Sequence, residues 1–219
     1  MQATLYTRRR LHHTATAVAT AVISTVLPYF IYATGFPFGT KGNKTIKLDN
    51  RYGNNQVQFH SKAPLEEING TASVTGSFSF DPSNIEATHG KIVVPVNSMQ
   101  TGIELRNKHL MSKDWLDEES YKEIVFDVKS ISSVQIVSSA QGKGVAKGIA
   151  EGVLFLHGVS KQISCPIELT YIEKGDVVMV KTEMSVSLRD FNISGKRGIV
   201  GSKVAETIAV KATMFGAGS

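Results

Sequence analysis

Apolar and polar residues alternate along most of the chain after about residue 44. The clearest stretch is ASVTGSFSF at 72–80, where five small or apolar residues alternate with serine and threonine. A period of two is typical of a strand that buries one face and exposes the other. The same pattern returns at 163–171 and at 204–212. The pattern therefore predicts an all-β protein.

Roughly eight to ten strands of this kind follow one another, joined mostly by short polar turns such as DPSN at 81–84. Long sequential strands favour an antiparallel up-and-down barrel, because closure removes the edges that an open sheet exposes. A sandwich of two sheets is the alternative. Gly148 and Gly152 lie inside predicted strands, where glycine typically marks a bulge or the close approach of a backbone or ligand. Pro95 predicts an edge or a bulge in its strand.

The first 35 residues differ from the rest. Three arginines at 8–10 precede a stretch at 14–35 that contains no charged residue. A basic flank followed by an apolar run predicts a signal peptide at 1–35, or an N-terminal membrane anchor if the segment is not cleaved. Residues 36–43, FPFGTKGN, are then expected to form a linker and 44–219 the folded domain. We therefore expect a periplasmic or secreted protein, membrane-anchored if the leader stays attached.

Composition narrows the classes of function. The leader holds three of the 24 basic residues and none of the 19 acidic ones, so the remaining charge is nearly balanced. It gives no reason to expect nucleic acid as a partner. The single cysteine, Cys165, excludes an internal disulfide. Because it alternates with Ile163 and Ile167, it is predicted to be a small buried side chain rather than a nucleophile.

Motifs for catalysis or metal binding are missing from the sequence. The histidines after the leader do not stand at metal-ligand spacing, and neither a nucleophile elbow nor a phosphate-binding loop is present. These histidines are His60, His89, His109 and His157. We therefore predict no enzyme, no metal site and no cofactor.

Residues 101–128, TGIELRNKHLMSKDWLDEESYKEIVFDV, interrupt the strand pattern. The first half is charged, lacks alternation and contains the only tryptophan, whereas the last six residues return to a strand. This insert closely resembles the signature of the YceI-like family of lipid-binding proteins. The matching positions are Thr101, Gly102, Arg106, His109, Leu110, Ser112, Asp114, Leu116, Asp117, Tyr121, Ile124 and Phe126. The departures are Asn107 in place of Asp, Trp115 in place of Phe and Lys122 in place of Pro.

Further similarity at 152–169, 190–193 and 204–214 extends the resemblance over nearly the whole chain after residue 45. The resemblance implies an exported, extended lipocalin-like antiparallel β-barrel with a short helical insert at one mouth. Its tunnel-like lumen would hold an isoprenoid or other long-chain amphiphile and no catalytic residues. The resemblance implies no cofactor other than a bound lipid, such as a polyisoprenoid quinone or alcohol.

The insert is expected to lie against the mouth of this barrel. Asp114 is predicted to cap the N-terminus of a helical turn, and the acidic residues at 117–119 are predicted to follow it and face water. The candidate ligand-binding residues of the lumen are Val74, Phe78, Phe80, Leu110, Trp115, Leu116, Phe126, Leu154, Ile163 and Ile167. Arg106 and His109 are the candidates for polar contacts at the mouth. For His109, a hydrogen bond to Asp114 or Asp117 that only stabilises the insert is the competing interpretation.

The sequence thus predicts an exported protein that sequesters or carries a long-chain amphiphilic lipid inside a β-barrel. Membrane contact would come from the N-terminal segment, and a homodimer is compatible with the sequence. One alternative is an enzyme that acts on an isoprenoid substrate with Arg106 and His109 as its polar site. The other is a ligand-free structural or interaction module of the cell envelope, with a collapsed core.

Overall fold

The computed structural model of the chain describes residues 34–38, 41–63, 65–194 and 204–218. Nearly all of the predicted signal peptide or anchor therefore lies outside the described residues. In the described ranges, no helix is both long enough and apolar enough to cross a membrane. The strands are β1 (Lys44–Leu48), β2 (Gln56–Lys62), β3 (Glu67–Ser73), β4 (Thr75–Phe80), β5 (His89–Pro95), β6 (Glu123–Ala140), β7 (Lys143–Leu156), β8 (Val159–Ile172), β9 (Val177–Ser187) and β10 (Thr207–Gly218).

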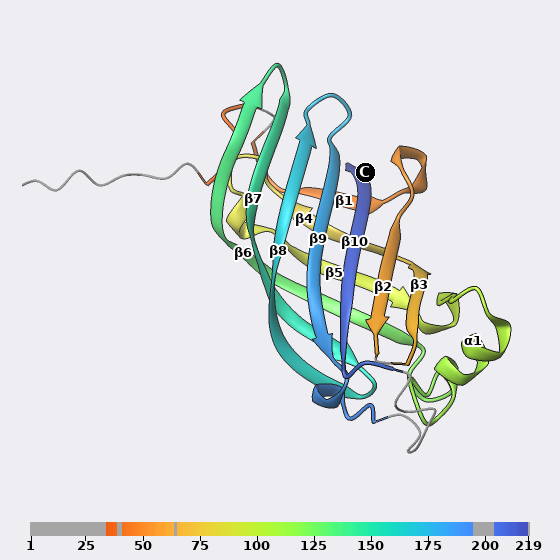
Figure 1. The fold of residues 1–219 in the computed structure, drawn as a ribbon. Helices are drawn as coiled ribbons and strands as arrows, with labels where there is room; N and C mark the ends of the chain where they lie inside the picture. Colours follow the sequence, from red (N-terminus) through yellow and green to blue (C-terminus); the bar gives the residue numbers. More distant parts are fainter. Residues whose placement is uncertain (1–33, 39–40, 64, 195–203, 219) are drawn as a thin grey trace, which may run out of the picture. The chain divides into compact units, whose positions relative to one another are not determined.

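These strands form one antiparallel sheet in the order β1-β4-β5-β6-β7-β8-β9-β10-β2-β3. The sheet closes because β1 also pairs with β10 (Figure 1). Strand β10 pairs with β2 over its first part and with β1 at its end. Strand β1 pairs on its other side with β4, and β2 pairs on its other side with β3. The result is a closed antiparallel barrel with eight strand positions. The predicted barrel is confirmed, and the sandwich is not formed.

Polar groups around Phe215 of β10 stabilise the break between β1 and β2. The N–H of Phe215 donates to Oδ1 of buried Asn55 at 2.6 Å, and its carbonyl accepts from the N–H of Asp49 at 2.9 Å. A buried backbone group without a partner would cost about 1–3 kcal/mol. Asn55 and Asp49 therefore allow β10 to change its neighbour from β1 to β2 without unpaired backbone groups.

The sharp coiling of β6 against β7 depends on glycine. The pairing of these strands shifts in register three times, once between Val128 and Ser130. A Cβ atom at Gly152 would collide with the backbone carbonyl oxygen of Asp127, and one at Gly148 would lie 2.7 Å from a methyl carbon of Ile131. The close approach that strand glycines predict is therefore present at both positions.

The alternation at 72–80 is confirmed, but the strand is divided. Ala72, Val74, Phe78 and Phe80 are buried, whereas β3 ends at Ser73 and β4 begins at Thr75. The prediction for Pro95 is wrong, because β5 pairs with β4 on one side and β6 on the other and Pro95 is simply its last residue. A strand end needs no further ladder hydrogen bond, so proline fits there.

The insert contains α1 (Glu104–Met111), which lies beside the ends of β2 and β3 (Figure 1). The predicted cap is wrong: Ile103 occupies the N-cap position without a side-chain hydrogen bond, and Asp114 follows the helix. Asn107 takes over the anchoring role. Its Oδ1 accepts from the N–H of Thr101 at 2.8 Å and from the Thr101 hydroxyl at 2.7 Å, which ties the helix to the chain before it.

The remaining acidic residues of the insert follow α1 in a series of turns. Glu119 is exposed as predicted, but Asp117 and Glu118 are half-buried. Asp117 has a positive φ of 45°, in the left-handed region that aspartate tolerates better than most residues. The backbone N–H groups of Ser120 and Tyr121 donate to its carbonyl at 3.0 and 2.8 Å. The acidic run therefore builds a turn after the helix instead of its first turn.

Aromatic rings close the end of the barrel opposite α1. Phe36, from the predicted linker, is buried and stacks on Tyr171 with 6.0 Å between ring centroids. Phe38 stacks on both rings, and Phe80 meets Tyr171 at 5.4 Å. Phe36 and Phe38 thus pack in the core, whereas Pro37 between them is exposed. The fully buried Tyr171 donates its hydroxyl to Asp176 at 2.6 Å.

Candidate functional site

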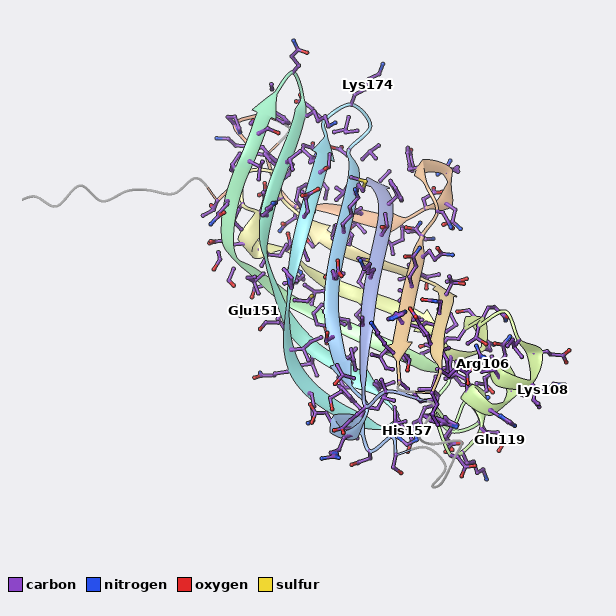
Figure 2. The ribbon with its side chains drawn as sticks, in the orientation of Figure 1. Arg106, Lys108, Glu119, Glu151, His157 and Lys174 are labelled. Carbon is purple, nitrogen blue, oxygen red and sulfur yellow. The ribbon has the colours of Figure 1, made fainter. Side chains whose placement is uncertain are left out.

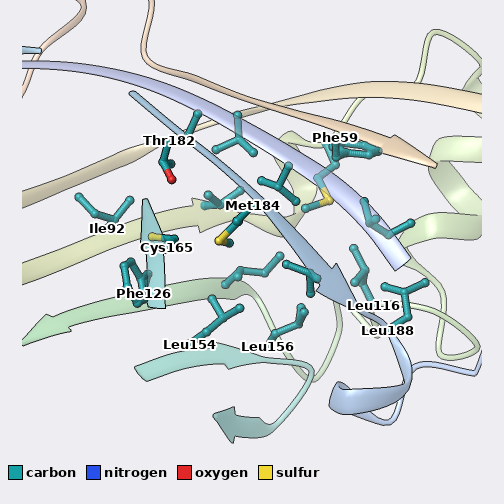
Figure 3. Close-up of a pocket in the computed structure, with 18 of the residues that line it drawn as sticks. Phe59, Ile92, Leu116, Phe126, Leu154, Leu156, Cys165, Thr182, Met184 and Leu188 are labelled. Atoms are coloured by element: carbon teal, nitrogen blue, oxygen red, sulfur yellow. The ribbon is translucent and has the colours of Figure 1, made fainter. Parts of the chain in front are cut away.

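The barrel encloses an apolar cavity of about 550 Å³. Inward-facing side chains from β2 to β10 line it, together with residues of the insert. Phe126, Leu154, Met184 and Leu188 are among the side chains that point into the common space in Figure 3. A cavity of this size and lining is in the range of small-molecule binding sites, which are mostly apolar with a few polar groups.

The cavity runs lengthwise between a closed end and a mouth. The far end stops at the packed aromatic residues around Tyr171 and Phe80, which do not line it. At the other end, Ile103 and Leu105 both line the cavity and are 50% and 63% exposed to solvent. Large apolar side chains that belong to a cavity wall and also reach solvent mark its opening. The mouth therefore lies at α1.

Most of the predicted lumen residues lie on the cavity wall. They are Phe78, Leu110, Trp115, Leu116, Phe126, Leu154 and Ile167. Trp115 and Leu116 are 7% exposed, so the short turns after α1 bring two large side chains inside. Whether these residues contact a ligand stays a prediction.

Three predicted residues are inside the protein but away from the cavity wall. Val74 lies at the junction of β3 and β4 and is buried against Ala212 and Met214. Phe80 is fully buried in the aromatic closure of the far end. Ile163 is half-buried and packs at the edge of the core near the mouth. For all three residues, the alternating pattern correctly predicted that the side chain points into the protein. The pattern could not predict the position of the side chain along the barrel axis.

Arg106 and His109 both line the cavity at the mouth. Arg106 projects from α1 (Figure 2) and forms an ion pair with Glu66, in the connection between β2 and β3. This pair joins α1 to the rim of the barrel. His109 is exposed, and its ring forms no hydrogen bond with the residues that the structure describes. The competing interpretation, a bond to Asp114 or Asp117, is therefore not found.

The prediction missed the contribution of the last strands to the wall. Val180, Thr182, Met184 and Val186 of β9 all line the cavity, as do alternate residues of β10 from Ile208 to Met214. The signal was present, because these residues repeat with a period of two. Phe59, on the same face as Val57 of β2, also lines the wall.

Polar groups are few inside the lumen. Thr182 lines the wall, and its hydroxyl donates to the carbonyl of Pro166 at 2.8 Å. Burial raises the pKa of the Cys165 thiol, so the group stays protonated at neutral pH. The Oγ1 atom of Thr88 is buried and has no hydrogen-bond partner in the described part of the chain. No group of three or more His, Cys, Asp or Glu that could hold a metal occurs in those residues. The lining of the described lumen is therefore mainly apolar.

The sequence profile of the YceI-like domain matches residues 47–214. A UPF0312 protein of Vibrio campbellii is 30% identical over 155 residues, which cover 67% of this chain and 75% of that protein. UPF0312 protein YE1254 of Yersinia enterocolitica is 29% identical over 140 residues, or 62% of this chain and 68% of its own length.

Solved structures share the fold. The crystal structure of Burkholderia cenocepacia BcnA superposes with a TM-score of 0.62 at 18% identity, covering 77% of this chain and 98% of that one. A polyisoprenoid binding domain from Saccharophagus degradans gives 0.61 at 14% identity, covering 81% and 100%. With the profile match, the closed barrel and the insert at its mouth, these likenesses lead to one assignment. The chain belongs to the YceI-like family.

Proposed function

We propose that the protein binds a long-chain lipid of the isoprenoid or a similar amphiphilic type inside its barrel. The observation that carries this proposal is the apolar cavity of about 550 Å³, closed at one end and open at α1. The family supports a binding protein rather than an enzyme, and the Saccharophagus degradans neighbour is described as a polyisoprenoid binding domain.

Burial of hydrocarbon is sufficient to drive such binding. Each CH₂ group that leaves water contributes about 0.8 kcal/mol, so a five-carbon isoprene unit contributes roughly 3–4 kcal/mol before ordering costs. The wall supplies apolar side chains on all sides, and the far end is sealed by aromatic residues. A long chain therefore needs few polar contacts in this lumen to bind well.

Exchange of the ligand would take place at the mouth. Ile103 and Leu105 offer an apolar path from the surface into the cavity. Arg106 is held by Glu66 beside this path, and the exposed His109 lies next to it on α1. We propose that these two side chains contact the polar end of a ligand whose chain is inside.

Export is the second part of the proposal. The basic and apolar pattern of residues 8–35 supports a protein that acts in the periplasm or outside the cell, or that stays tethered to the membrane by an uncleaved segment. A closed apolar lumen suits this setting, because a long-chain lipid crosses aqueous space only if its chain is covered.

Organic extraction of the purified protein, followed by mass spectrometry, tests the proposal. We expect a long-chain apolar molecule in roughly equimolar amount. The variant Ala150→Phe places a ring inside the lumen, where Ala150 lines the wall, and should lose this molecule. The matched control Ala140→Phe adds the same ring at an exposed position and should retain it.

Both variants must first show the unsubstituted far-UV spectrum, since overpacking a core costs about 1–3 kcal/mol. Equal amounts of lipid in Ala150→Phe and Ala140→Phe would show that the extracted lipid does not occupy the lumen. The absence of any lipid from the unsubstituted protein, together with failure to take up added long-chain lipid, would contradict the proposed function.

A further inference from the structure

The wall of the cavity ends at one level of the barrel. The last inward residue on the wall and the first one beyond it are Leu169 and Tyr171 on β8, Val180 and Val178 on β9, and Phe78 and Phe80 on β4. Leu169 pairs with Val180, and the register then pairs Tyr171 with Val178, so β8 and β9 leave the wall at the same height. Phe80 packs against Tyr171 at this height. We call Tyr171, Val178 and Phe80 the end layer.

Phe36 completes the end layer. Its ring lies against Gly144 of β7 so closely that a Cβ atom there would collide with it, and Gly144 pairs with Tyr171. Gly144 is two residues beyond Ala146, which is the partner of Leu169. The rings of Phe36 and Tyr171 are nearly parallel, with 14° between their planes. Phe36 therefore lies beside Tyr171, one inward position beyond the last residues of the wall.

This ring comes from outside the barrel strands. Phe36 precedes β1, and it also precedes residues 47–214, which the profile of the YceI-like domain matches. Its backbone N–H donates to the carbonyl of Pro82 at 2.7 Å, in the turn after β4, and this bond fixes the segment against the barrel. A side chain from the segment before β1 therefore helps to close the lumen that the strands enclose.

A filled layer limits the length of a ligand chain. Each CH₂ group that leaves water for the lumen strengthens binding by about fourfold. Once the tail of the chain has reached the end layer, further CH₂ groups stay outside the mouth and add nothing. The rings cannot give way without losing their own contacts, because a close-packed interior has no spare volume.

We propose that Phe36 sets the longest chain that the barrel accepts, because it completes the layer at which the tail stops. Phe36 does not line the cavity, so it acts through the space that it denies to the ligand. This inference rests on the proposed function and narrows it to chains that end at the level of Leu169.

Competition among chain lengths tests this inference on the purified full-length protein. The protein is equilibrated with one mixture of even-numbered primary alcohols, from 1-decanol to 1-docosanol, delivered from cyclodextrin. Gel filtration removes the free alcohols, and mass spectrometry measures the bound ones. The result is the ratio of each bound alcohol in a variant to that in the unsubstituted protein. All proteins share the same mixture, so this ratio does not depend on how cyclodextrin holds each alcohol.

Phe36→Ala removes a whole ring from the end layer, which leaves space for at least about two further CH₂ groups. The longest alcohols should therefore gain about tenfold relative to the shortest. Phe36→Leu keeps most of the buried apolar surface and serves if Phe36→Ala does not retain the far-UV spectrum of the unsubstituted protein. It should change the ratio in the same direction by a smaller factor.

Phe59→Ala is the matched control. It removes the same ring from the cavity wall nearer the mouth, where Phe59 packs in the cluster that contains Trp115. It should change the binding of all lengths alike and leave the ratio flat. Val180→Phe adds a ring at the last level of the wall and should exclude the longest alcohols while the shortest still bind.

Two results would overturn the inference while leaving the proposed function intact. One is a flat ratio in both Phe36 variants with the alcohols still bound. The other is an equal loss at every length, which would show that Phe36 supports only the fold. If the unsubstituted protein binds no alcohol of any length, the proposed function fails and this inference fails with it.

Discussion

Replacing Phe36 with alanine tests whether the segment before β1 belongs to the folded barrel. The ring is 4% exposed and stacks on Tyr171 and Phe38 at 6.0 and 5.6 Å between centroids. It also covers Gly144 of β7 so closely that a Cβ atom there would collide with it. A flexible linker would make none of these contacts.

The expected cost follows from these contacts. Burying a phenylalanine side chain contributes about 2–3 kcal/mol, and aromatic pairs add about 0.5–1.5 kcal/mol. Phe36→Ala should therefore lower the free energy of unfolding by about 3–4 kcal/mol, consistent with the usual range for Phe→Ala in a core. The matched control is Phe155→Ala, because Phe155 is 41% exposed. Its cost should stay below about 1 kcal/mol.

Urea unfolding measures both variants, with Trp115 fluorescence and far-UV circular dichroism as independent probes. The two probes should give coincident transitions, since Trp115 lies near the mouth and the strands span the whole barrel. If Phe36→Ala loses no more stability than Phe155→Ala, residues 36–38 are a linker and the far end of the barrel is not closed by them.

The remaining predictions concern buried polar groups. Thr182→Val should destabilise the ligand-free protein by about 1 kcal/mol, because the carbonyl of Pro166 loses its hydrogen-bond donor. Thr88→Val should be neutral or stabilising, because the hydroxyl that it removes has no partner among the described residues. Urea unfolding measures both variants, and equal shifts of the two midpoints would contradict this reasoning. Burial opposes ionisation of Asp176, but hydrogen bonds from Lys44 and Tyr171 outweigh it and lower the Asp176 pKa below 3.8. Its contribution to stability is therefore present above pH 3.8 and lost as the pH falls through the lowered pKa, so Lys44→Met should destabilise at pH 7 and progressively less below pH 3.8 in urea titrations. The buried Cys165 thiol should react with iodoacetamide at pH 8 far more slowly in the native protein than in urea; equal rates would place it at the surface.

Alternation identified the buried face of each strand, but it carries no information about height along the barrel. Phe78 and Phe80 share a face and a residue type, yet Phe78 lines the cavity and Phe80 closes the far end. The difference arises from the neighbours of each ring: Phe80 packs against Tyr171 in the aromatic closure of the far end, whereas Phe78 lines the cavity. Register between distant strands depends on the whole sheet and is not readable from one segment.

Other features were accessible in principle or lay beyond a single sequence. Two phenylalanines in FPFGTKGN, at 36 and 38, are unusual for a solvated linker and could have indicated packing. The insert was located correctly, but its helix begins at Glu104 and not after Asp114, because Asn107 rather than an aspartate cap fixes it. The missing partner of Thr88 is a property of its surroundings, so only the folded chain reveals it.

A crystal structure of the protein loaded with 1-bromohexadecane tests most directly whether the barrel is a lipid container. The bromine atom gives an anomalous signal that locates the chain without ambiguity. We expect the peak inside the barrel, within contact distance of wall residues such as Leu154 and Met184. An interior filled by the protein's own side chains, with bromine only on the outer surface, would contradict the account.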